Sequence, residues 1–78
     1  MKVRLELNGP IKLPDGKRIV EVEVSPGTPV SEILGRSLQC PPEQVRFLQV
    51  SRNGSALAPG EPLEGACTLK VFLRLGGG

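Results

Sequence analysis

Three stretches of alternating apolar and polar residues dominate this sequence and limit what it can fold into. They are KVRLEL (2–7), RIVEVEV (18–24) and TLKVFLRL (68–75). A period of two puts every second side chain on the same face, so each stretch predicts a strand with one apolar face. The residues expected to face the core are Val3, Leu5, Leu7, Val20, Val22, Val24, Leu69, Val71, Leu73 and Leu75.

Between the second and the last of these strands, residues 25–40 change to a period near 3.6 and predict one short helix. The residues that share its apolar face are Val30, Ile33, Leu34 and Leu38. We expect Thr28 to cap this helix and Pro29 to occupy its first position. Gly35 weakens the helix by about 1 kcal/mol relative to alanine, so tertiary packing must hold it.

The rest of the chain reads as turns around one more strand. PPEQV (41–45) predicts a single helical turn, and RFLQVS (46–51) predicts a strand whose Leu48 and Val50 face the core. Asn53-Gly54 predicts a tight turn, and residues 55–65 predict a loop with a brief extended piece.

The order of these elements favours an α+β fold. A last strand so rich in apolar residues needs a central position, which places it beside the first strand and parallel to it. We therefore expect a mixed sheet of four to five strands with one main helix packed across one face. The deepest core positions should include Leu5, Val22, Leu34, Leu48 and Val71.

Composition excludes several classes of function. The 78 residues suffice for one domain, and the net charge of +2 is spread among acidic residues, which argues against a nucleic-acid partner. The absence of histidine removes the commonest general base and metal ligand, so the chain is not expected to be an enzyme or to bind a metal. No signal peptide and no membrane-spanning run are recognisable, which predicts a cytoplasmic protein without a membrane partner.

The two cysteines, Cys40 and Cys67, are too few for a zinc site and too far apart for a CxxC redox pair. We interpret them as small, partly buried apolar side chains. A reactive thiol is the alternative that the sequence leaves open.

Several motifs resemble a known family. VSPGTPVSEIL (24–34) is similar to the entry into the helix of molybdopterin synthase small subunits. The run from FLQVSRNG (47–54) to LAPGEPLEGACTLKVFLRLGGG (57–78) resembles the thiamine-pathway sulfur carriers. The ending LRLGGG is also similar to the LRLRGG of ubiquitin, with Gly76 in place of an arginine. The resemblance covers essentially the whole chain and implies the ubiquitin-like β-grasp fold, with a domain at residues 1–75 and a flexible glycine tail at 76–78.

Glycines suit a reactive tail, because an unsubstituted residue leaves its carbonyl unhindered and can thread a narrow channel. A loose end or a remnant of a cloning linker is the simpler alternative. The resemblance implies that Gly78, preceded by Gly76 and Gly77, is the acyl-transfer terminus. A ubiquitin-activating-type enzyme would adenylate it with ATP, and sulfur transfer would then give a thiocarboxylate, with no cofactor bound by the chain itself.

Three functions remain open at this point. The first is a sulfur carrier for molybdopterin, thiamine or thiolation chemistry, which would pass sulfur to an enzyme such as a large synthase subunit. The second is a ubiquitin-like modifier joined through Gly78 to target lysines. The third is a β-grasp interaction module whose tail has no role.

The phase of the strands also predicts a partner-binding surface. Phe47 and Phe72 should point away from the core on neighbouring strands, with Lys70 and Arg74 beside Phe72. Leu75, the next residue along the chain, is counted with them as a candidate for partner binding. Exposed aromatic residues with basic neighbours often anchor an interface. The alternative is that one of the rings packs under residues 55–65 in a small satellite core.

Overall fold

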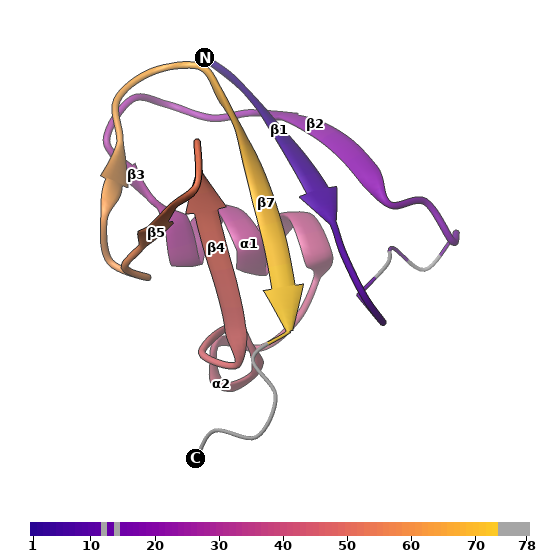
Figure 1. The fold of residues 1–78 in the computed structure, drawn as a ribbon. Coiled ribbons are helices and arrows are strands. Elements are labelled where there is room, and N and C mark those ends of the chain that lie inside the picture. Colours follow the sequence, from indigo (N-terminus) through magenta and orange to yellow (C-terminus); the bar gives the residue numbers. More distant parts are fainter. Residues whose placement is uncertain (12, 14, 74–78) are drawn as a thin grey trace.

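The computed structural model describes residues 1–11, 13 and 15–73, which form a sheet with the main helix packed on one side of it (Figure 1). The predicted sequence of elements is confirmed, and two strands of two residues each are added to it. In chain order the elements are β1 (Lys2–Leu7), β2 (Ile19–Glu23), β3 (Thr28–Pro29), α1 (Val30–Leu38), α2 (Pro42–Val45), β4 (Leu48–Arg52), β5 (Ser55–Leu57), β6 (Pro62–Leu63) and β7 (Cys67–Leu73).

The five-stranded sheet has the order β2-β1-β7-β4-β5. β7 pairs with β1 in parallel and with β4 in antiparallel, so the last strand lies at the centre as predicted. The register places Leu5 beside Leu69 and Val50 beside Val71, which brings the apolar sides of the strands onto one face. The α+β class with one main helix is therefore confirmed.

The core lies between this apolar face and α1. Leu5 and Val71 are fully buried and Leu34 is nearly so, as predicted. The buried apolar residues are Val3, Leu5, Leu7, Val24, Val30, Ile33, Leu34, Val45, Val50, Leu63, Leu69 and Val71. Val22 and Leu48 were expected among them but are only half-buried. Val22 belongs to an edge strand with a neighbour on one side only, and Leu48 is the first residue of β4.

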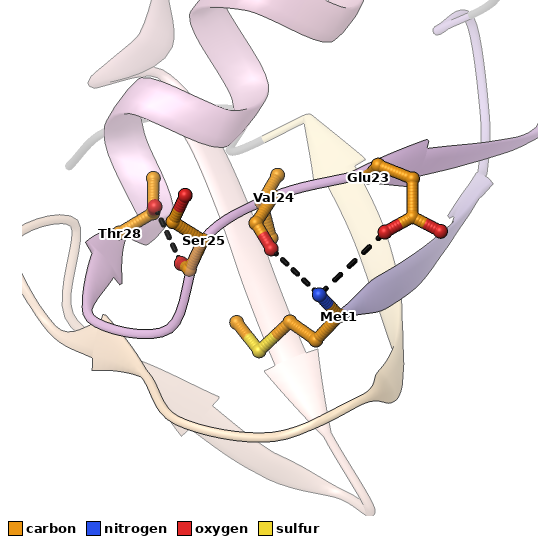
Figure 2. A network of polar contacts seen from close by, with 5 residues as sticks. All are labelled: Met1, Glu23, Val24, Ser25 and Thr28. Atoms are coloured by element: carbon orange, nitrogen blue, oxygen red, sulfur yellow. Dashed lines mark hydrogen bonds and ion pairs between the residues drawn. The ribbon is translucent and has the colours of Figure 1, made fainter.

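The start of α1 differs from the prediction. Thr28 and Pro29 are not helical: they form β3 and pair with Leu63 and Pro62 of β6. The Thr28 hydroxyl donates a hydrogen bond to the Ser25 carbonyl at 2.7 Å, as Figure 2 shows, and Pro29 occupies the N-cap position without a side-chain cap.

The first amides of α1 find their partners elsewhere. Val30 N–H donates to the Glu61 carbonyl at 3.0 Å, and Ser31 N–H donates to the Pro59 carbonyl at 2.8 Å. These loop carbonyls accept the hydrogen bonds that a capping side chain would otherwise accept. The prediction that Thr28 caps α1 is therefore wrong, because the first amides of the helix already have partners.

Residues 55–65 contain more structure than the predicted loop with one extended piece. β5 pairs with β4 after the Asn53-Gly54 turn, in which both residues have positive φ (52° and 81°), and β6 pairs with β3. The predicted tight turn is confirmed, since positive φ at both central residues is the signature of a type I′ hairpin.

The N-terminal ammonium group ties β1 to the end of β2 (Figure 2). It donates a hydrogen bond to the Val24 carbonyl at 2.9 Å and lies 3.5 Å from the Glu23 carboxylate. Val24 N–H in turn donates to the Met1 carbonyl at 2.9 Å, so the ladder between the two strands extends beyond the strands themselves.

Candidate functional site at the end of β7

The candidate site is built around the strand that leads toward the glycine tail. β7 is held on both sides, by β1 and by β4, and its last residue, Leu73, lies opposite Leu48. This end of the sheet lies near α2, below the centre of the view in Figure 1. Arg74, Leu75 and Gly76–Gly78 lie outside the described residues, as does the predicted boundary between domain and tail.

Phe72 projects from the face of the sheet opposite to α1. It is 40% exposed, and it lies opposite Gln49 of β4 in the register. Lys70, one step along the same face, is exposed and lies between Glu6 and Ser51. The structure therefore places an aromatic ring and a cation on one accessible face, and their role in binding stays a prediction.

Phe47 is also exposed, at 53%, but it does not belong to β4. It lies in the turn after α2, where its N–H donates to the Gln44 carbonyl at 3.1 Å. The guanidinium carbon of Arg46 lies 5.6 Å from the centre of the ring, a distance at which a cation attracts an aromatic face. Because 53% of Phe47 and 40% of Phe72 are exposed, neither ring is fully buried.

An apolar groove that the sequence did not reveal adjoins Phe47. Its volume is about 380 Å³, and its lining includes Ile11, Leu38, Leu48 and Leu73. These residues come from the connection after β1, the end of α1, the start of β4 and the end of β7. Because they are far apart in sequence, no motif or spacing could have found the groove. It lies beside the last described residue of β7.

The remaining candidate groups are the acidic side chains and the two cysteines. Among residues 1–11, 13 and 15–73, no group of three or more acidic, cysteine or histidine side chains could hold a metal ion. Cys40 and Cys67 are free thiols that are half-buried against the core, in agreement with their interpretation as small apolar side chains. Within the same described part of the chain, neither helix has the length and apolar character needed to cross a membrane.

Comparison with solved structures gives full-length matches. SAMP1 from Haloferax volcanii, a small archaeal modifier protein, is 25% identical over 100% of both chains, with a TM-score of 0.71. The ubiquitin of Caldiarchaeum subterraneum is 21% identical over 100% of this chain and 98% of its own, with a TM-score of 0.65. A candidate molybdopterin converting factor subunit 1 from Pyrococcus furiosus is 16% identical over 95% of this chain and 98% of its own, with a TM-score of 0.70.

No protein-family profile matches the chain, and no curated protein sequence matches it significantly. The similarity to known proteins therefore lies in the three-dimensional structure. The sheet order, the parallel pairing of the first and last strands and the full-length structural matches agree with the resemblance found in the sequence. Together they show that this chain has the ubiquitin-like β-grasp fold, which is also the fold of SAMP1 and of the molybdopterin converting factor subunit.

Proposed function

We propose that this protein is a sulfur carrier whose Gly78 carboxylate is adenylated by a ubiquitin-activating-type enzyme and converted to a thiocarboxylate. The observation that carries the proposal is the central position of β7, from which the sequence continues through Arg74 and Leu75 into three glycines. The full-length structural match to a candidate molybdopterin converting factor subunit supports it.

Adenylation and sulfur transfer require an activated and unhindered terminal carboxylate. A carboxylate is a poor electrophile, so the partner enzyme transfers AMP from ATP to the terminal carboxylate and releases pyrophosphate. Hydrosulfide then attacks the acyl carbon and displaces AMP, which leaves the thiocarboxylate. Glycine has no side chain to obstruct the attack or the passage of the backbone through a channel. The chain supplies the acyl group, while the enzyme binds ATP and supplies the catalytic groups.

The exposed face of β7 fits a recognition role in this scheme. Phe72 and Lys70 lie on it, and Phe47 with its groove lies at the end from which the tail continues. An activating enzyme that contacts these residues would hold the tail in its channel, since buried aromatic anchors commonly dominate an interface. A sulfur-accepting enzyme, such as a large synthase subunit, would use the same end of the molecule. We place these events in the cytoplasm.

A second function, a protein modifier, is favoured by the 25% identity with SAMP1. In that case the amine of a target lysine displaces AMP, or an intermediate thiol, and an isopeptide bond forms at Gly78. The adenylation step is shared, so only the fate of the activated tail separates the two functions.

Mass spectrometry tests the proposal directly. The protein is incubated with the activating enzyme of its own organism, ATP and sulfide, and its intact mass should rise by the difference between sulfur and oxygen. A variant without Gly77 and Gly78 should keep the same thermal unfolding but show no change in mass. If the truncated variant still forms an adenylate, the tail is not the reactive end and the proposal fails.

The two fates can be told apart in cells of the source organism. Trypsin cleaves after Arg74, so a conjugated target would carry Leu-Gly-Gly-Gly on a lysine amine. Finding this remnant would establish the modifier function, whereas a thiocarboxylate without any such remnant would establish the sulfur carrier. If neither is found and the truncated variant retains the protein's activity in cells, the chain is an interaction module.

A further inference from the structure

The connection between β1 and β2 forms one wall of the groove beside Phe47. Pro10 and Ile11 line this groove together with Leu73, the last described residue of β7. Ile11 is half-buried and packs against the core, so its position depends on the path of the connection. A change in this path would alter the surface at the end of β7, where the sequence continues into the tail.

Arg18 holds this connection from the side of β2. Its Nη1 donates hydrogen bonds to the Gly9 carbonyl at 2.6 Å and to the Ile11 carbonyl at 3.3 Å. The Arg18 carbonyl accepts a hydrogen bond from Leu7 N–H at 2.7 Å, so the backbone of this residue is fixed to β1 while its side chain reaches the connection. Hydrogen bonds from a charged donor are stronger than those between neutral groups, so these two contacts restrict residues 9–11.

Asn8 holds the start of the same connection from the side of β7. Its side-chain amide donates to the Glu6 carbonyl at 3.1 Å and to the Val71 carbonyl at 3.4 Å. Its backbone N–H also donates to the Val71 carbonyl, at 2.9 Å. Asn8 therefore fixes where the connection leaves β1, and Arg18 fixes the residues that follow.

We propose that Arg18 is a positioning residue for activation of the tail. It holds residues 9–11 in place, so that the groove beside Phe47 is formed before the activating enzyme binds. A surface that is already ordered loses less conformational freedom on binding, which raises affinity. The inference rests on the proposed function, because it requires that the activating enzyme contact this groove. Arg18 itself is exposed, so its replacement should leave the core intact.

Enzyme kinetics with the full chain test this role. With the activating enzyme of the same organism and ATP, Arg18→Gln should raise the KM for the carrier by about two- to ten-fold, with kcat unchanged. The groove contributes to binding in the ground state and the transition state alike, so only KM changes. Arg52→Gln, at the other end of β4, is a matched control for the loss of one positive charge and should leave KM unchanged. An unchanged KM for Arg18→Gln would overturn the proposal.

Salt separates positioning from a direct charge contact with the enzyme. The screening length falls from about 10 Å at 0.1 M salt to about 3 Å at 1 M, so a contact between exposed charges weakens as salt rises. Positioning acts within the carrier, so the ratio of the two KM values, Arg18→Gln over the original chain, should stay the same across this range. A ratio that falls to one at high salt would overturn the proposal.

Amide hydrogen exchange, followed by NMR, tests the positioning without the enzyme. Ile11 N–H donates to the Asn8 carbonyl at 3.4 Å, and its exchange should be at least about two-fold faster in Arg18→Gln. The amide of Leu5 in β1 should keep its rate, and deletion of Gly77 and Gly78 should change neither. Unchanged exchange at Ile11 would overturn the role of Arg18 alone, whereas a failure of the original chain to be adenylated would overturn the proposed function.

Discussion

Gly35 lies in the middle of α1, and its replacement by alanine should stabilise the protein. Glycine in a helix interior costs about 0.8–1.0 kcal/mol relative to alanine, because its backbone loses more conformational freedom. The structure has room for the methyl group: a Cβ at this position would lie 3.7 Å from the Cys40 carbonyl oxygen and 3.9 Å from Cγ2 of Val45, both ordinary van der Waals distances. No strain is expected to offset the gain.

The free energy of unfolding should therefore rise by about 1 kcal/mol, which corresponds to roughly 4–8 °C in melting temperature for a domain of this size. Urea titration and thermal unfolding, both followed by circular dichroism, measure these quantities. Gly54→Ala is a matched control: its surroundings are open, but its φ of +81° is unfavourable for alanine, so the same added methyl group should destabilise the protein. A decrease in stability for Gly35→Ala would refute the inference that a methyl group fits between Gly35, Cys40 and Val45.

The remaining predictions concern the core, the start of α1 and the partner surface. Leu5→Ala should lower the free energy of unfolding by about 2–4 kcal/mol. Leu48→Ala should lower it clearly less, because Leu48 is half-buried. Equal losses of unfolding free energy in chemical denaturation would contradict this difference in burial. Thr28→Val should cost less than about 1 kcal/mol in the same assay, because the hydroxyl bonds within a turn and does not cap the helix. Phe72→Ala should weaken binding to the activating enzyme by about 2 kcal/mol or more, measured by calorimetry, with little change in melting temperature; lower stability with unchanged affinity would instead make Phe72 part of the core.

The buried and exposed faces of the strands could be predicted because apolar and polar residues alternate in the sequence. Leu5 and Val71 lie on the apolar side of this alternation and are buried, whereas Phe72 lies on the other side and is exposed. The central position of β7 could also be inferred, because a strand with this many apolar residues needs neighbours on both sides. These predictions depend on local patterns and on the need to cover apolar surface.

The features that were missed depend on contacts between distant segments. Threonine is a residue type that often caps helices, but here the carbonyls of Pro59 and Glu61 accept the hydrogen bonds of the first amides of α1 in place of Thr28. Val22 has the phase of a core residue, but its exposure is decided by its place in an edge strand. The groove beside Phe47 likewise exists only once segments far apart in sequence have come together.

The sheet holds β7 and β2 to different degrees. β1 lies between these two strands, and β2 is the outermost strand on that side of the sheet. β7 is bonded to β1 on one side and to β4 on the other, so a pull on the tail is resisted by two ladders. β2 is bonded on one side only, and its ladder to β1 is extended by the Met1 ammonium group and Val24. A force applied at the C-terminal end of β7 would therefore be shared between two ladders, whereas a force applied to β2 would act on a single ladder.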